Sequence, residues 1–101
     1  MHPENPRPAA LGAAALLAIG ETERAREWLT RALAIDPDDL LTLYNAACIY
    51  AHLGEADRAL DLLERFIPLA NDLNRAWIKH DSDFDSLRGH PRFQKILEQI
   101  G

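Results

Sequence analysis

Residues 46–63 read AACIYAHLGEADRALDLL, and the stretch GAAALLAIGETERAREWL at residues 12–29 has the same plan 34 positions earlier. Eight pairs agree in residue or residue class at this offset: Ala13 with Ala47, Ile19 with Leu53, Gly20 with Gly54, Glu21 with Glu55, Arg24 with Arg58, Ala25 with Ala59, Leu29 with Leu63, and Leu33 with Ile67. A second shift places Leu43 on Trp77 and Tyr50 on Phe84. A fixed period of this length is typical of proteins built from stacked structural repeats. The chain is therefore predicted to be a repeat protein.

The second copy predicts a helical hairpin. Apolar residues three or four positions apart predict one helix over about residues 39–53 and another over about residues 56–67. Gly54 lies between them, and glycine tolerates the left-handed backbone with which many helices end. Pro68 is expected to end or kink the second helix, because proline has no N–H to donate.

The first copy has the same plan. One helix is expected to run to about Ile19, with Gly20 as the break. A second helix is expected over about residues 22–36, and Pro37 stops it. The two copies together therefore predict two hairpins, each of which buries its apolar faces only by stacking on its neighbour.

The residues that cap and join these helices are also predicted. Asp38 or Asp39 is expected to cap the first helix of the second copy, because a carboxylate there accepts from free backbone N–H groups. Small side chains are expected where paired helices cross, since larger ones would push the axes beyond about 8–10 Å. These small residues are Ala13, Ala25, Ala47 and Ala59.

The third copy is cut short. Trp77 lies in register with an inward position, but DSDFD at residues 81–85 is expected to end the helix, because Asp and Ser favour caps and turns. Pro91 is expected to open a final helix, since proline suits the first helical position. The predicted inward stripe of that helix is Phe93, Ile96, Leu97 and Ile100.

This pattern resembles the tetratricopeptide repeat family over roughly residues 6–80. The resemblance rests on the 34-residue period, the Gly-Ala framework, the large residues Tyr50 and Leu63, and Asp36-Pro37 at the end of the first copy. It implies an all-α fold, a right-handed superhelix of antiparallel helix hairpins with two full repeats, a truncated third repeat and a C-terminal capping helix. We expect a single domain over residues 1–101, made of a repeat at 6–39, a repeat at 40–73, and the truncated repeat and cap at 74–101.

The segment from Trp77 to Leu97 has a resemblance of its own. It is similar to the tail that closes repeat arrays in many bacterial multidomain proteins, where a Trp-containing helix, an acidic turn, Leu-Arg and Pro-Arg-Phe recur. This similarity implies that the chain is the C-terminal end of a longer array.

Charge and composition exclude several classes of function. The net charge is −5 and no basic stripe is visible, so nucleic-acid binding is not expected. The apolar run over residues 9–19 is too short to span a membrane. Cys48 is the only cysteine, which excludes an internal disulfide and favours a reducing, cytoplasmic location.

The sequence also predicts no enzyme, no cofactor and no metal site. No Cys-x-x-Cys or His-x-x-x-His spacing occurs. The alternating aspartates from Asp81 would need Gly and Glu where Ser86 and Arg92 stand to form a calcium loop. Cys48 and His52 lie one helical turn apart, but no third group is evident that would orient the imidazole for catalysis.

The family resemblance implies where a partner would bind. In this family the first helix of each hairpin lines a concave groove that holds a peptide or a partner protein. The implied partner-binding residues are Leu41, Tyr44, Asn45, Cys48 and His52 in the second copy and Arg75 and Lys79 in the third. The first copy would add Ala10, Leu11, Ala14 and Ala18.

Part of this set matches a known clamp. Some family members grip a peptide's terminal carboxylate at five places, of which Asn45, Arg75 and Lys79 match three, while Ala10 and Ala14 occupy the other two. Half a clamp with a weakly polar far wall favours an apolar or mixed peptide. The alternative is that Arg75 and Lys79 only form a solvated helix face.

The first helix permits a different function. Leu11, Leu16, Leu17 and Ile19 leave it without a clearly polar side, whereas the outermost helix of an array needs one. Either further repeats precede it, or it packs against a second copy of the chain. The principal hypothesis is therefore a non-catalytic protein-interaction module, and the alternative is a homodimerisation element.

Overall fold

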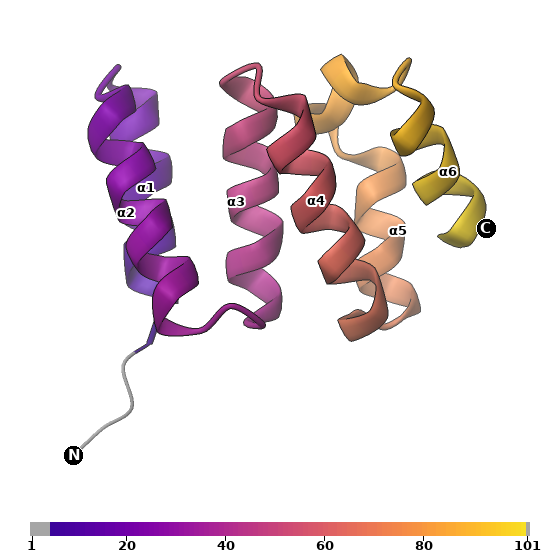
Figure 1. Cartoon of the computed structure of the whole chain (residues 1–101), viewed down its shortest axis with the longest axis horizontal. Helices are drawn as coiled ribbons and strands as arrows, with labels where there is room; N and C mark the ends of the chain where they lie inside the picture. The colour runs from indigo at the N-terminus through magenta and orange to yellow at the C-terminus, as the bar shows by residue number, and fades with distance from the viewer. Residues whose placement is uncertain (1–4, 101) are drawn as a thin grey trace.

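The structure is a computed structural model that describes residues 5–100; residues 1–4 and 101 of the predicted domain lie outside them. All regular secondary structure in the described residues is helical: α1 (Arg7–Ala18), α2 (Thr22–Ile35), α3 (Leu40–His52), α4 (Ala56–Phe66), the 3-10 helix η1 (Ile67–Leu69), α5 (Asp72–His80), the 3-10 helix η2 (Ser82–Leu87) and α6 (Pro91–Ile100). The prediction of an all-α fold is confirmed. Figure 1 shows the helices in sequence order across the molecule, from the α1–α2 pair to α6.

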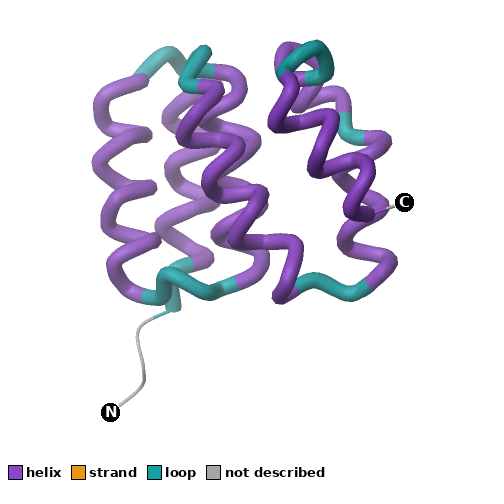
Figure 2. The backbone as a smooth tube through the Cα atoms, turned by 45° about the vertical axis from the view of Figure 1, so that its right-hand side comes forward, coloured by secondary structure: helices purple, strands orange, loops and turns teal. Residues whose placement is uncertain are grey.

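Both hairpin turns depend on a glycine. Gly20 and Gly54 have φ angles of +85° and +78°, in the left-handed region that side chains with a Cβ avoid. Each comes after the first helix of its hairpin, as the sequence predicted. Figure 2 shows the connecting loops at opposite ends of the helices, as expected when consecutive helices run antiparallel.

The hairpins close on small residues. Ala13, Ala25, Ala47 and Ala59 are all fully buried. Helix α1 packs on α2, and α3 packs on α4, as the two predicted hairpins require. The first hairpin then stacks on the second because both α1 and α2 contact α3.

Gly12 has a different role, within helix α1. A Cβ built there would lie 2.2 Å from Cζ3 and 2.4 Å from Cε3 of Trp28. The indole of Trp28 in α2 therefore occupies the space that any side chain at this position would need. Glycine is unfavourable in a helix interior, and this close approach of Trp28 explains why Gly12 nevertheless stands there.

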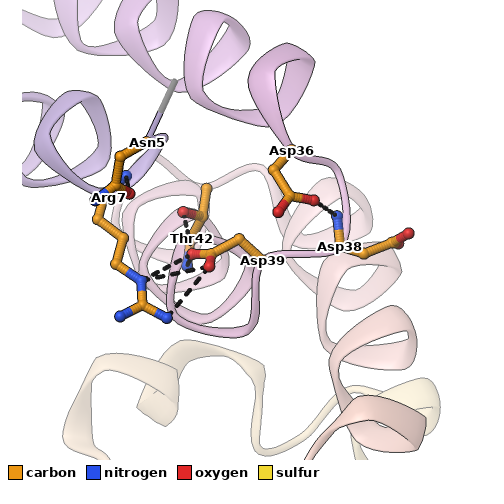
Figure 3. Close-up of polar contacts among 6 residues, drawn as sticks. All are labelled: Asn5, Arg7, Asp36, Asp38, Asp39 and Thr42. Atoms are coloured by element: carbon orange, nitrogen blue, oxygen red, sulfur yellow. Dashed lines mark hydrogen bonds and ion pairs between the residues drawn. The ribbon is translucent and has the colours of Figure 1, made fainter. Parts of the chain in front are cut away.

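The junction between the two hairpins is held by Asp39, shown in Figure 3. Its carboxylate accepts from the Thr42 backbone N–H at 3.0 Å and from the Thr42 hydroxyl at 2.7 Å. Arg7, at the start of α1, donates to the same carboxylate at 3.3 Å. Burial raises the pKa of Asp39, but the bonds from Thr42 and Arg7 outweigh burial and hold that pKa below its ordinary value. Of the two aspartates considered, Asp39 is thus the cap.

The third copy ends as the acidic turn predicted. Helix α5 stops at His80, and the Asp81 side chain caps η2 by accepting from the Asp83 backbone N–H at 2.9 Å. Phe84 in η2 is fully buried, and η2 packs on α3. Trp77, in contrast, is 37% exposed, while its neighbour Ile78 is fully buried. The expectation that Trp77 points fully inward is therefore wrong, and the buried position on this part of α5 is that of Ile78.

Helix α6 closes the stack. Phe93 and Ile96 are buried, and Leu97 and Ile100 pack partly buried against the core, as predicted. On its outer face Arg92 donates to Asp61 at 2.6 Å and to Glu64 at 2.8 Å, two carboxylates of α4. The last helix is therefore joined to the second hairpin by both apolar contacts and ion pairs.

Candidate functional site

A hollow of about 570 Å³ lies between α1, α3 and η2. It forms because α1 and η2 both pack on α3 and leave part of that helix uncovered between them. The residues that line it are Ala14, Leu17, Ala18, Tyr44, Asn45, Cys48, Ile49, His52, Asp81 and Asp83. Ala14, Leu17, Ala18 and Ile49 are apolar, and the two carboxylates, Asp81 and Asp83, lie at the η2 side.

Helix α3 supplies the floor of the hollow. Positions 45, 48, 49 and 52 are three or four residues apart and so share one helical face. Cys48 and Ile49 on this face are buried, whereas His52 is exposed, so the face opens to solvent toward its C-terminal end. On the α1 side the hollow is lined by Ala14 and Ala18, whose small side chains leave space between α1 and α3.

Tyr44 and Asp81 join α3 to the acidic turn. The Tyr44 hydroxyl donates to Asp81 Oδ2 at 2.5 Å. The Tyr44 ring is buried and meets Phe84 edge-on, with 5.6 Å between centroids. Burial first, and then the bond to Asp81, raise the pKa of Tyr44 well above its ordinary value, so the phenol stays a donor. This pair fixes the position of the Asp81 carboxylate at the edge of the hollow.

The remaining polar groups are a thiol and a His–Asp pair. His52 Nε2 lies 2.7 Å from Asp83 Oδ1, with both side chains about half exposed. Burial, followed by the charges of Asp81 and Asp83, raises the pKa of Cys48 well above its usual range. The thiol is therefore neutral at physiological pH. The lining includes two carboxylates, Asp81 and Asp83, and no lysine or arginine.

Two family models support the repeat assignment. Models described as tetratricopeptide repeat match residues 11–39 and residues 28–61. The chain belongs to the tetratricopeptide repeat family. No curated protein and no solved structure matches this tetratricopeptide repeat chain. Tetratricopeptide repeats generally mediate protein–protein interaction and are typically non-catalytic.

The hollow coincides with part of the groove that the tetratricopeptide repeat resemblance implied. Of the implied partner-binding residues, Tyr44, Asn45, Cys48 and His52 line it. Leu41, Arg75 and Lys79 are not among its lining residues, and their role in binding stays a prediction. From the first copy, Ala14 and Ala18 line the hollow. The expectation that Ala10 faces a groove is wrong, because Ala10 is fully buried.

Arg75 has other partners in the tetratricopeptide repeat stack. Its Nε donates to the Ile67 backbone carbonyl at 3.0 Å, and its Nη1 lies 3.7 Å from Asp72. The same Ile67 carbonyl accepts from the Ala70 backbone N–H at 3.2 Å, so the Arg75 guanidinium adds a second hydrogen bond to it. The third copy faces the hollow with Asp81 and Asp83 instead, two residues that the sequence analysis interpreted only as caps and turn.

The fold also gathers residues that sequence spacing keeps apart. The ligand atoms of Cys48, Asp81 and Asp83 lie within 4.8 Å of one another, the one such trio among residues 5–100. Both carboxylates already accept hydrogen bonds, from Tyr44 and the Asp83 N–H to Asp81 and from His52 to Asp83. Since the thiol is also neutral, Cys48 is not activated as a nucleophile here.

Two exposed apolar residues of α5, Leu73 and Trp77, lie near Tyr44, which lines the hollow. The Trp77 ring meets Tyr44 edge-on at 5.4 Å, and Leu73 lies one turn earlier on α5, 70% exposed. We call Leu73 and Trp77 the α5 shelf. Sequence reasoning missed it because Trp77 was placed in the core. None of the helices in the described part of the chain is long and apolar enough to cross a membrane.

Proposed function

We propose that the chain is a non-catalytic interaction module that binds a peptide segment of another protein in the hollow between α1, α3 and η2. The observation that carries this proposal is the hollow itself, which has room for side chains and a largely apolar lining. The family's general role in protein–protein interaction supports it. The neutral thiol of Cys48 speaks against covalent catalysis at this site.

The setting of the module belongs to the same proposal. The similarity of residues 77–97 to tails of bacterial repeat arrays supports a scaffold role at the C-terminal end of a larger bacterial protein. The one cysteine, Cys48, is free and buried, which supports a cytoplasmic location.

Selection from a library of short random peptides tests the proposal. Peptides that bind the chain are expected to lose most of their affinity for Ala14→Phe, because a phenyl ring on α1 fills the hollow. Ala15→Phe is the matched control, since Ala15 is exposed on the same helix but does not line the hollow. If the selected peptides bind both variants as they bind the parent, the site is elsewhere.

A homodimer through α1 is the second candidate function. Leu11 and Ile19 on this helix are 63% and 73% exposed, and no charged residue lies between Pro8 and Gly20. Exposed apolar surface of this kind favours a protein contact. Sedimentation velocity over a concentration series should show a dimer that Leu11→Glu removes; a monomer at every concentration would exclude this function.

A further inference from the structure

We propose that the hollow selects a peptide segment that presents a lysine or arginine side chain, and that Asp83 is the residue that sets this preference. The proposal rests on the proposed function, since it names the chemistry of the peptide held at that site. It differs from the expectation built on Arg75 and Lys79, under which an acidic group would bind near the third copy.

The first argument is the balance of charge around the hollow. Two carboxylates, Asp81 and Asp83, face it, and the only other titratable groups among the lining residues are Tyr44, Cys48 and His52. Tyr44 and Cys48 are neutral, because burial raises both pKa values.

A protonated His52 would offset one negative charge at most. Two of the donors to Asp81, the Tyr44 hydroxyl and the Asp83 N–H, are neutral and leave its charge in place. The titratable residues that line the hollow therefore keep a net negative charge, which a basic ligand group can complement.

The nearest basic side chain on the turn is already engaged. Arg88 donates through Nε to Asp85 at 2.8 Å and through Nη2 to the Asp81 backbone carbonyl at 3.1 Å. Neither bond reaches the two carboxylates that face the hollow. Arg88 therefore does not neutralise Asp81 or Asp83, and these carboxylates can pair with a basic group of a bound partner.

The second argument is the shape of the lining. A lysine or arginine side chain has an apolar stem and a charged end. The apolar stem can pack on the side chains of Ala14, Leu17, Ala18 and Ile49. The charged end can then pair with the carboxylates at the η2 side. The α5 shelf beyond Tyr44 offers Trp77 and Leu73 to an apolar residue next to the basic one.

The two carboxylates have different roles. Asp81 caps η2 and accepts from Tyr44, so its position is set by the fold. Asp83 Oδ1 lies 2.7 Å from Nε2 of the exposed His52 imidazole, and the Asp83 side chain is 41% exposed, so a ligand cation can reach it. Asp83 is therefore the group to change without disturbing the turn.

The test begins with the peptides selected from the random library on the parent chain. Peptides whose binding Ala14→Phe abolishes are sequenced, and enrichment of lysine and arginine over aspartate and glutamate is expected. The affinity of one such peptide is then measured with its basic residue intact and with that residue changed to Gln.

Asp83→Asn completes a double-mutant cycle with this pair of peptides. It should weaken the basic peptide about tenfold and leave the Gln peptide unchanged, because only a charged pair is lost. Asp85→Asn is the matched control, an exposed carboxylate of the same turn that pairs with Arg88 instead. Melting curves report whether each variant is folded, and the Gln peptide tests the charge without any change to the protein.

Three results are possible, and they separate the two proposals. Enrichment of basic residues together with coupling between the peptide cation and Asp83 supports both. Peptides that need the open hollow but bind equally well after the Gln change, or after Asp83→Asn, overturn the basic preference and leave the groove as the site. If no selected peptide depends on the hollow, the proposed function fails and this inference fails with it.

Discussion

Replacing Gly12 by alanine is expected to destabilise the fold, although alanine is the better helix former. In a helix interior alanine is favoured over glycine by about 1 kcal/mol. Against this, the new Cβ would lie 2.2 and 2.4 Å from two carbons of the Trp28 ring, where unstrained carbons approach to about 3.5–4.0 Å. The indole must therefore shift by more than about 1 Å. Overpacking of this kind costs about 1–3 kcal/mol, so the net loss is about 1 kcal/mol.

The sign of the effect depends on Trp28 alone, which permits a sharp control. In a Trp28→Ala background the clash is absent, and Gly12→Ala should then stabilise by up to about 1 kcal/mol. The coupling between the two positions is thus about 2 kcal/mol. Urea unfolding of the four proteins, followed by far-ultraviolet circular dichroism, measures it. An equal effect of Gly12→Ala in both backgrounds would refute the packing of Trp28 over Gly12.

The remaining predictions concern the helix crossing, the first junction and the metal question. Ala59→Leu adds three heavy atoms at a fully buried crossing and should cost about 1–3 kcal/mol; a melting temperature unchanged from the parent would show that the crossing is misplaced. Because the pKa of Asp39 is lowered in the fold, its charge stabilises the fold above the unfolded pKa near 3.8, and this stabilisation is lost as pH falls through the lowered value. Asp39→Asn keeps the cap but not the charge, so the stability difference from the parent should shrink below about pH 4; a difference independent of pH would contradict this. Excess EDTA should leave the melting curve unchanged, and a clear destabilisation would point to Cys48, Asp81 and Asp83 as metal ligands.

The features that sequence predicted are those set by local geometry. Gly20 and Gly54 mark turns because their backbone conformation requires glycine, whatever surrounds them. The crossing alanines are explained by the repeat itself, since equal positions in two copies meet the same packing demand. Asp39 was found as a cap because capping depends on residues three positions away.

The candidate site was predicted only in part, because it joins segments distant in sequence. The α3 face from Tyr44 to His52 is set by helical spacing and was found. Asp81 and Asp83 face that helix only because η2 folds back on α3, a contact that no local pattern encodes. The Arg75 guanidinium donates to the Ile67 carbonyl in η1, a contact between two elements that helical spacing within α5 does not predict. Trp77 was misplaced for a similar reason, since its exposure depends on the packing of the chain beyond α5.

The location of the bound peptide is the most direct test of the central proposal. Backbone amide shifts of the ¹⁵N-labelled chain, recorded with and without the tightest selected peptide, report that location residue by residue. If the hollow is the site, the largest changes should fall on its lining in α1, α3 and η2, at Ala14, Ala18, Asn45, His52 and Asp83. Changes confined to α2, α4 and α6 would place the partner outside the hollow and contradict the proposed function.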